Sequence, residues 1–427
     1  MTRFSFAVRG LAALAWLLPS DAAAQSACPG VTSRLSPKMG SGYRVNVLAS
    51  GLQNPRHIAV DSAGNLLVAE GGSGSVQRLV LREQGDIVCV QSKSALTSDQ
   101  STNHGIALGA DGRTLFTSNL SSVTAYEYDA DAGKVGPGKV LIRGMYHDGH
   151  PTRTLLVSRS SPDVMAIARG SRLNIDTPTV DQSSGRSMIK TFSIAQSRLA
   201  AIDYISGGEV LGWGLRNIVG MDEDPLGAVW SVENSIDDLR VNGNDVHNEN
   251  PAEKLNYHGA LGISNNTAKG ANFGYPWCVP AWDTEMLGVA GQAGLTVGTL
   301  FAPDDVPKLE AGEGCAAHPP GALHFDPHTA PLDFKFTANG SSAYIAFHGS
   351  WDRQPADGYR VMRIDFANGK PVAPPTSKTA AIPVMENSNL GNCPGGCFRP
   401  VGLAFDGKGR LYVSSDSTGE VYVVYGA

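Results

Sequence analysis

Six short apolar segments, each preceded by a tight turn, recur along this chain at intervals of roughly fifty residues or more. They are NLLVAE at 65–70, TLFTSN at 114–119, DVMAIA at 163–168, AVWSVE at 228–233, SAYIAFH at 342–348 and RLYVSSD at 410–416. The turns before them, such as SAG at 62–64 and ANG at 338–340, are typical of hairpins. A further apolar run precedes most of the turns, so each unit predicts two antiparallel strands.

This repeat predicts an all-β fold, a six-bladed β-propeller in which each blade is a small antiparallel sheet. Long insertions precede the fifth unit, and we expect them to form loops on the face that carries the active site. The segment YRVNVLA at 43–49 is expected to close the ring by pairing with the last blade. No linker or charge run divides residues 25–427, which favours one domain. A β-sandwich with chance similarity among its hairpins is the alternative.

The N-terminus has the features of a secretory signal. Arg3 and Arg9 precede an apolar stretch at 10–18, and the small residues 22–24 fit a cleavage site. Residues 1–24 are therefore predicted to be removed, which leaves a secreted, extracellular domain at 25–427. The N-x-S/T sites at Asn119, Asn265 and Asn339 would carry glycans if the host glycosylates.

All six cysteines follow the predicted signal, and an even number in an oxidising compartment predicts three disulfides. Pairing of neighbours closes the shortest loops: Cys28 with Cys89, Cys278 with Cys315, and Cys393 with Cys397. Sequence alone leaves fifteen pairings open.

Polar residues gather where propeller strands begin and end. Residues that enter a blade's inner strand and residues that leave its second strand lie at the same end of the ring. The entering residues are Arg56, His104, His150, Arg153, Arg216, Asn217 and Arg399, and the leaving residues are Arg169, Asn234, Ser235, Arg353 and Asp416. So many arginines at one tunnel mouth predict a small, multiply anionic ligand, because the guanidinium fork binds carboxylates and phosphates bidentately. Separate structural ion pairs are the alternative.

The net charge of −6 disfavours nucleic acid as a partner and disfavours adhesion to anionic membranes.

Three stretches resemble the soluble PQQ-dependent sugar dehydrogenases, a family that includes the sorbosone dehydrogenases and the fungal pyranose dehydrogenases. They are 211–235 with GWGLRN and SVENS, FHGSWDRQPADGYRVMRI at 347–364, and FRPVGLAFDGKGRLYVSSDSTGEVYVV at 398–424. The resemblance runs from about Val45 to Tyr425 and is closest to the fungal pyranose branch. It implies a six-bladed propeller that binds pyrroloquinoline quinone (PQQ), a tricarboxylate, and oxidises the anomeric C1 hydroxyl of pyranoses. Rare or keto-sugars such as 2-keto-glucose or fucose are expected before glucose.

The resemblance also implies roles for single residues. Arg216 and Asn217 match the pair that contacts the quinone oxygens, and Arg216 would stabilise the charge of the reduced quinone. His150 matches the catalytic base, with His147 and His348 as alternatives. Arg353 and Arg399 match partners of the cofactor carboxylates, and Arg169 is grouped with them. However, Arg169 stands where glucose-oxidising members have an aspartate that orients the base, which leaves that orienting partner undefined.

The family also implies Ca²⁺, held by backbone carbonyls at the positions of Asn234 and Ser235 and polarising the quinone carbonyl. A second, structural calcium or a solvated acidic loop would account for four acidic residues downstream: Asp237, Asp238, Asp245 and Glu253.

Two other functions stay open on the sequence. One is a calcium-dependent hydrolase of the lactonase or paraoxonase type, which would need a tunnel rich in carboxylates rather than in arginines. The other is a propeller that binds a partner without catalysis. For a dehydrogenase, the sequence lacks the cytochrome domain of some fungal relatives. We therefore expect electrons to leave to an external acceptor, such as a secreted cytochrome or a copper monooxygenase.

Overall fold

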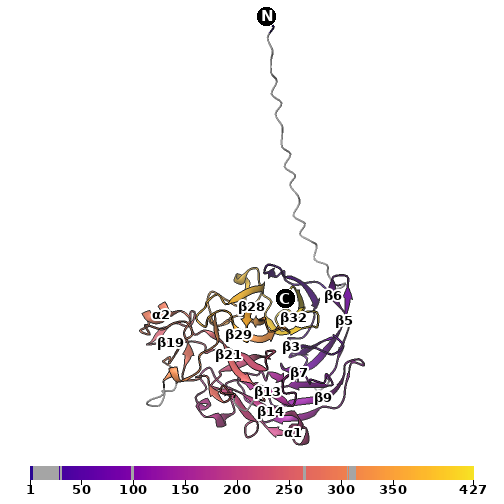
Figure 1. The fold of residues 1–427 in the computed structure, drawn as a ribbon, viewed down its shortest axis with the longest axis horizontal. Coiled ribbons are helices and arrows are strands. Elements are labelled where there is room, and N and C mark those ends of the chain that lie inside the picture. Colours follow the sequence, from indigo (N-terminus) through magenta and orange to yellow (C-terminus); the bar gives the residue numbers. More distant parts are fainter. Residues whose placement is uncertain (3–27, 29–30, 98–100, 263–265, 305, 307–313) are drawn as a thin grey trace.

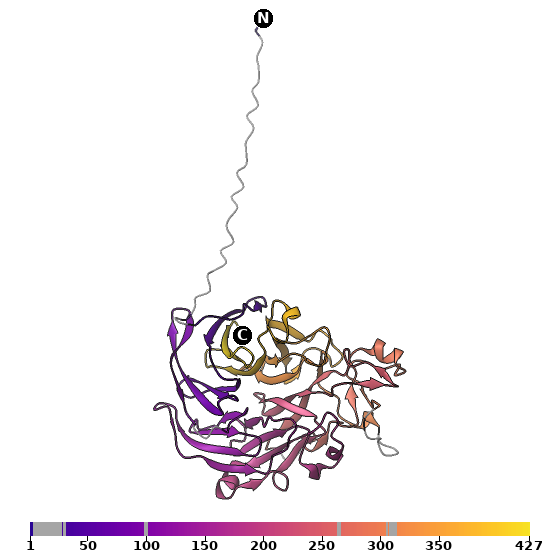
Figure 2. The same cartoon turned by 180° about the vertical axis from the view of Figure 1, so that it is seen from behind.

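A computed structural model describes residues 1–2, 28, 31–97, 101–262, 266–304, 306 and 314–427. The glycosylation site at Asn265 and nearly all of the predicted signal segment lie outside the described residues. Within the described part, six antiparallel sheets follow one another around a central channel (Figure 1), and the view from behind shows the same ring (Figure 2). The prediction of a six-bladed β-propeller is confirmed, and the sandwich alternative is wrong.

Each blade contains four main strands, ordered from the channel outward. The first blade is β3 (Pro55–Val60), β4 (Leu66–Glu70), β5 (Ser75–Gln84) and β6 (Ile87–Ala95). The second is β7 (Ile106–Leu108), β8 (Thr114–Ser118), β9 (Val123–Asp129) and β11 (Lys139–Arg143), extended by β10 (Lys134–Val135) and β15 (Ile202–Asp203). The third is β12 (Leu155–Val157), β13 (Val164–Arg169), β14 (Met188–Ser193) and β16 (Glu209–Trp213), extended by β22 (Ala271–Asn272).

The remaining blades follow the same order. The fourth is β17 (Asn217–Glu223), β18 (Ala228–Asn234), β21 (Glu253–Ala260) and β25 (Leu323–Phe325). The fifth is β26 (Pro331–Phe336), β27 (Ser342–Phe347), β28 (Arg360–Ala367) and β30 (Ala381–Glu386), extended by β1 (Lys38–Met39) and β29 (Lys370–Pro371). The sixth is β31 (Pro400–Phe405), β32 (Leu411–Ser415), β33 (Glu420–Tyr425) and β2 (Arg44–Ala49).

The ring closes through β2, which comes early in the chain and forms the outer strand of the last blade. It pairs antiparallel with β33, with Val45 opposite Val424 and Val47 opposite Tyr422. The first and last blades are therefore neighbours, as the indigo and yellow strands show in Figure 1. The prediction that 43–49 closes the ring is confirmed.

The hydrophobic core is divided among the six interfaces between neighbouring blades. On β4, Leu66 and Val68 pack toward the sixth blade, whereas Leu67 and Ala69 pack toward the second. This alternation follows from the two-residue period of a strand. Because a blade is covered on both faces, β4 is buried along its whole length. Each fully buried aliphatic side chain contributes about 1.5–3 kcal/mol to stability.

The predicted insertion before the fifth blade is confirmed, and it has a core of its own. It contains the pair β19 (Arg240–Val241) and β20 (Asn244–Asp245), the pair β23 (Val279–Pro280) and β24 (Leu300–Phe301), and helix α2 (Thr284–Val289). Both views show it projecting from one side of the ring (Figures 1 and 2). Tyr275 and Leu287 belong to this core.

Short helical segments lie between the other strands: α1 (Ile194–Leu199), η1 (Thr177–Val180), η2 (Gln182–Ser184), η3 (Cys315–Ala317) and η4 (Leu390–Asn392). None of the helices in the described part of the chain has the length and apolar character needed to cross a membrane.

The three disulfides join neighbouring cysteines, as the shortest loops would have it. Cys28 bonds Cys89, Cys278 bonds Cys315, and Cys393 bonds Cys397. The first of these ties the segment before β2 to β6, and so links the two blades that meet where the ring closes.

Removal of the first disulfide by Cys28→Ser with Cys89→Ser should lower the free energy of unfolding by about 4 kcal/mol. The cause is the entropy of a 61-residue loop in the unfolded chain. Guanidinium unfolding without reductant measures this. The matched control is Cys393→Ser with Cys397→Ser, which opens a loop of 4 residues and should cost about half as much. Equal losses for the two pairs would contradict the loop-length argument.

Candidate active site

Strand ends bring most of the predicted site residues to one face of the ring, in two groups. The Arg56 group comes from the first, fifth and sixth blades and consists of Arg56, His348, Arg399 and Asp416. The Arg216 group comes from the segments that follow β11, β13, β16 and β18 and consists of His150, Ser171, Asn174, Arg216, Asn217 and Asp237.

The Arg56 group is built around one carboxylate. The Oδ2 of Asp416 lies 2.6 Å from Nη1 of Arg56, and Nε2 of His348 lies 2.9 and 3.0 Å from the two oxygens of Asp416. Burial alone would raise the pKa of Asp416, but the hydrogen bond from His348 and the charges of Arg56 and Arg399 hold it below its usual value. Asp416 is therefore ionised, and it compensates one of the two guanidinium groups.

Arg399 supplies the uncompensated charge of this group. It donates to the backbone carbonyls of His348 (3.2 Å) and Gly349 (2.8 Å), and its guanidinium carbon lies 5.4 Å from the ring centre of Tyr359. Carbonyls and an aromatic face orient a guanidinium without neutralising it. With two arginines against one aspartate, the Arg56 group carries one excess positive charge, which suits an anionic ligand.

Arg216 is held rigidly and is almost completely buried. Its Nη2 lies 2.5 Å from Oδ2 of Asp237 and 3.0 Å from Oδ1 of Asn174, and its backbone N–H donates to Glu233 at 2.8 Å. The side chain of Arg216 is 6% exposed. A buried charge of this kind is stable only because it is paired and hydrogen-bonded.

Gly170 allows His150 and Asn217 to approach each other. A Cβ at this glycine would lie 2.5 Å from Oδ1 of Asn217 and 2.9 Å from Cβ of His150, too close for any larger residue. Oδ1 of Asn217 is buried and has no hydrogen-bond partner among the described residues. An unpaired buried polar atom costs about 1–3 kcal/mol, so this amide is suited to a ligand that completes its bonding.

His150 is held as a neutral imidazole. Its Nδ1 lies 2.9 Å from the carbonyl oxygen of Ser171 and 3.1 Å from Oγ of the same residue. A carbonyl can only accept, so Nδ1 carries the proton and Nε2 has a free lone pair. Burial, and then the charge of Arg216, lower the pKa of His150 to about 4.

Two predicted arginines have a different role. Arg169 is 3% exposed and donates to the carbonyls of Met145 (3.0 Å), Tyr146 (3.1 Å) and Gly185 (2.8 Å). Arg153 is fully buried and also donates to the carbonyl of Met145. The prediction that Arg169 binds cofactor carboxylates is not supported by these contacts, because its fork is occupied by backbone. We instead assign both side chains to positioning the segment 145–152.

Arg353 forms a third set of contacts on this face. Its Nη1 lies 3.3 Å from a carboxylate oxygen of Asp357 and donates to the carbonyl of Pro327 at 3.2 Å. The structure thus compensates Arg353 with a carboxylate, unlike Arg399. His147, an alternative base, has its Nδ1 occupied by the N–H of Gly149 at 3.0 Å.

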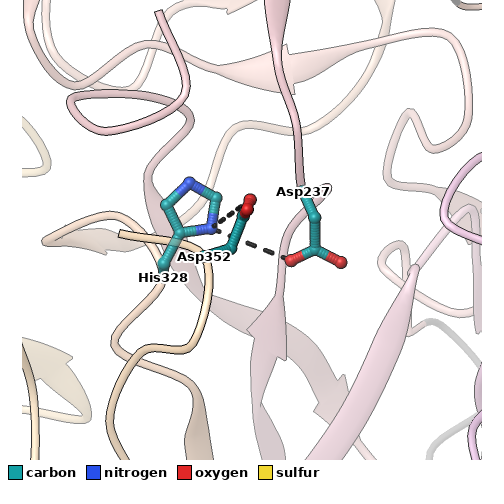
Figure 3. Close-up of side chains that lie close together, drawn as sticks. All are labelled: Asp237, His328 and Asp352. Carbon is teal, nitrogen blue, oxygen red and sulfur yellow. Dashed lines mark ion pairs between the residues drawn. The ribbon is translucent and has the colours of Figure 1, made fainter. Parts of the chain in front are cut away.

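Beside Arg216, the side chains of Asp237, His328 and Asp352 form a cluster in which both carboxylates face one imidazole (Figure 3). Nδ1 of His328 lies 3.8 Å from an oxygen of Asp237 and 3.8 Å from an oxygen of Asp352. Its Nε2 lies 2.6 Å from the carbonyl of His247. This carbonyl takes the Nε2 proton and leaves Nδ1 facing two carboxylates, an arrangement that needs a cation, either a second proton or a metal ion.

The cluster fits a hard divalent cation. Two ligand atoms 3.8 Å apart can share one ion at the usual Ca²⁺–oxygen distances of about 2.3–2.6 Å. Glu253 lies behind the cluster, where its Oε2 accepts from the backbone N–H of Ser235 at 2.7 Å. Burial raises the pKa of Glu253 to about 7. Although burial opposes it, the carboxylates of Asp237, Glu253 and Asp352 raise the pKa of His328.

The predicted metal residues are divided by the structure. Asn234 ends β18 and donates its side-chain N–H to Pro331, and Ser235 leads directly into the cluster. Asp237 and Glu253 of the proposed second calcium set lie at the cluster, whereas Asp245 pairs with His247 and is half exposed.

Sequence reasoning missed His328 and Asp352. The available signal was position, because DPHT at 326–329 precedes the inner strand of the fifth blade, as Arg56, Arg216 and Arg399 do in theirs.

Comparison with known proteins gives consistent matches. A family model described as TrAA12-like matches residues 37–427. A pyrroloquinoline quinone-dependent sugar dehydrogenase of Hypocrea jecorina is 40% identical over 399 residues, or 91% of this chain and 89% of that protein. A calcium structure of a Trichoderma reesei enzyme of carbohydrate-active family AA12 is 40% identical, with a TM-score of 0.85 over 93% of this chain and 100% of that one. The holo form of the pyranose dehydrogenase PQQ domain from Coprinopsis cinerea is 36% identical, with a TM-score of 0.85 over 93% and 99%.

Proposed function

Because the chain belongs to the TrAA12-like family, we propose that it is a PQQ-dependent dehydrogenase that oxidises the anomeric C1 hydroxyl of pyranose sugars. The observation that carries this proposal is the neutral His150, which lies among Arg216 and Asn217 with an unprotonated Nε2. A general base beside a fixed positive charge is the arrangement that removal of a hydride and a proton from an alcohol requires.

The residues on the page fit a tricarboxylate quinone. Asn217 offers a buried amide without a partner, and Arg399 offers a positive charge that no ion pair in the described part of the chain compensates. We propose that Arg216 and Asn217 contact the quinone oxygens, and that Arg399, supported by Arg56, binds the carboxylates. Arg353 joins them only if its ion pair with Asp357 opens. PQQ, when bound, supplies a two-electron acceptor for the C1 hydride.

Calcium is the cation we propose for the cluster of Asp237, His328 and Asp352, together with the backbone carbonyls of Asn234 and Ser235. Carboxylate oxygens suit Ca²⁺, and a nitrogen donor is tolerated where a carboxylate shares the site. The link between Asp237 and Arg216 at 2.5 Å connects this cation site to the residue that would contact the quinone.

The protein side of the reaction then follows from the contacts. His150 accepts the proton of the C1 hydroxyl at Nε2, while Ser171 holds the other ring nitrogen. Arg216 stabilises the negative charge that develops as the hydride leaves the sugar. Its bonds to Asp237 and Asn174 fix its orientation, so little reorganisation is needed during the reaction.

Substrate and acceptor are proposed at a finer level. Rare or keto-pyranoses such as 2-keto-glucose or fucose are proposed before glucose, since no carboxylate contacts His150 where glucose-oxidising members place one. We propose an extracellular enzyme, which the three disulfides support. It would pass electrons to a separate acceptor, such as a secreted cytochrome or a copper monooxygenase.

The test is reconstitution of the purified protein with PQQ and Ca²⁺ and a panel of pyranoses, with an artificial dye as acceptor. We expect quinone absorbance on the protein and dye reduction that depends on sugar, PQQ and Ca²⁺ together. Hydrolysis of lactones without PQQ would instead favour a calcium-dependent hydrolase, and absence of both activities would favour a binding propeller. Stopped-flow mixing of sugar-reduced enzyme with a cytochrome or copper monooxygenase tests the acceptor.

A further inference from the structure

Ser171 lies at the point where the two sides of the proposed reaction meet. It is fully buried and follows Gly170 at the end of β13. Its N–H donates to the carbonyl of Arg216 at 2.8 Å, and its own carbonyl accepts from both the backbone N–H (3.2 Å) and Nδ1 (2.9 Å) of His150. One residue therefore sets the position of the base relative to Arg216.

The hydroxyl of Ser171 adds a second contact to the imidazole. Oγ donates its proton to the carbonyl of Leu173 at 2.8 Å, so its lone pairs face Nδ1 of His150 at 3.1 Å. Tyr275 fixes this carbonyl in turn, because its hydroxyl lies 3.3 Å from the oxygen of Leu173 and 3.0 Å from that of Asn174. The acceptors around Nδ1 are thus held from behind.

The side chain one turn of the strand away cannot do this work. Arg169, which stands where a carboxylate partner would be expected from the resemblance, donates to three carbonyls and is 3% exposed. Other charged or titratable groups that act on His150 are Arg216, Asp237, Arg153 and His147. Of these only Asp237 is anionic, and it is paired with Arg216.

We propose that Ser171 is the positioning residue of the catalytic base, and that its carbonyl and hydroxyl hold His150 in place of a carboxylate. This inference rests on the proposed function, because it assigns His150 as the base. Ser171 selects the tautomer with the lone pair on Nε2 and aligns the ring. A neutral partner leaves the imidazolium that forms during the reaction without a counter-charge of its own, so the base stays unprotonated in acid.

The consequence is a dehydrogenase whose activity persists at acid pH. Since the pKa of His150 is lowered to about 4, the base loses its lone pair only as the pH falls through that value. The acid limb of kcat/KM should lie near this pH. A carboxylate next to Nδ1 would move the limb upward by about one to three pH units, because an adjacent opposite charge favours the charged imidazolium.

The test compares Ser171→Asp and Ser171→Ala with the control Ser183→Asp, which adds the same charge at an exposed position. Nitrogen NMR of ¹⁵N-histidine-labelled protein, recorded without PQQ, reports the tautomer and titration of His150. We expect the proton on Nδ1 in the wild type, and a titration midpoint raised by about one unit or more in Ser171→Asp. We expect no change in Ser183→Asp.

The kinetic arm uses the reconstituted enzyme. Ser171→Asp should move the acid limb of kcat/KM upward together with the NMR midpoint, and Ser171→Ala should lower kcat about tenfold at unchanged KM through misalignment of the base. A proton on Nε2 in the wild type, or an unchanged midpoint in folded Ser171→Asp, overturns the inference. If Ser171→Asp does not fold, the wild-type tautomer and the kcat of Ser171→Ala decide. Because the NMR arm needs no cofactor, failure of the proposed dehydrogenase activity would be seen separately.

Discussion

The His150→Gln variant should lose about 10²- to 10⁴-fold of kcat with each pyranose that the wild type oxidises. Glutamine keeps a polar side chain of similar length, but it cannot accept the hydroxyl proton as hydride leaves C1. The binding of PQQ should change little, since the proposed contacts of the cofactor are made by Arg216, Asn217 and Arg399. Steady-state kinetics with saturating PQQ and Ca²⁺ give kcat, and the quinone absorbance gives occupancy.

His147→Gln is the matched control, because His147 lies on the same loop and its Nδ1 already accepts from Gly149. It should retain kcat within about threefold, as expected for a residue that does not touch the reacting atoms. A kcat for His150→Gln close to that of the wild type would remove His150 from the mechanism. His348, hydrogen-bonded to Asp416, would then be the next base to test.

The second large effect is expected on calcium binding. His328→Gln and Asp352→Asn should each weaken Ca²⁺ binding by about 100-fold or more, because changes to mere outer-shell partners already cost 10- to 100-fold. Both side chains face the same space as Asp237 (Figure 3). Titration calorimetry with Ca²⁺ on protein without PQQ measures the affinity directly. Dye reduction should recover in part at high Ca²⁺.

Asp245→Asn controls for a general loss of negative charge, since Asp245 is half exposed and pairs with His247 outside the cluster. It should bind Ca²⁺ as the wild type does. Unchanged affinity in both cluster variants would show that the cation sits elsewhere, for instance on backbone carbonyls alone. The raised pKa of His328 would then mean that a proton balances the two carboxylates.

The fold could be predicted from the sequence because strand signals in a propeller are local. The apolar runs that became β4, β8, β13, β18, β27 and β32 are buried on both faces, so they needed no long-range information. The fifth inner strand escaped notice because β26 reads PLDFKF, in which Asp333 and Lys335 interrupt the apolar pattern. Those two charges are paired with each other at 2.6 Å, a contact that a linear pattern cannot reveal.

The site was predicted less completely, because strand position places a Cα but not the end of a long side chain. Arg169 and Arg216 both lie where a blade meets the site face, yet one turns to backbone carbonyls and the other to Asp237. Which acceptors lie within reach depends on loops such as 145–152 and 235–252, whose conformations are set by tertiary packing. The same uncertainty hid the neutral partner of His150, since a carbonyl has no signature in the sequence.

The ion pair between Arg56 and Asp416 joins residues 360 positions apart, across the seam where β2 meets β33. The anion-binding corner is consequently among the last parts of the molecule to be assembled, since one half is synthesised at the start and the other at the end. Until both termini have been exported and zipped together, the nascent polypeptide has no complete cradle for a polycarboxylate. Loading of such a ligand is thereby deferred to the finished molecule, outside the cell that made it.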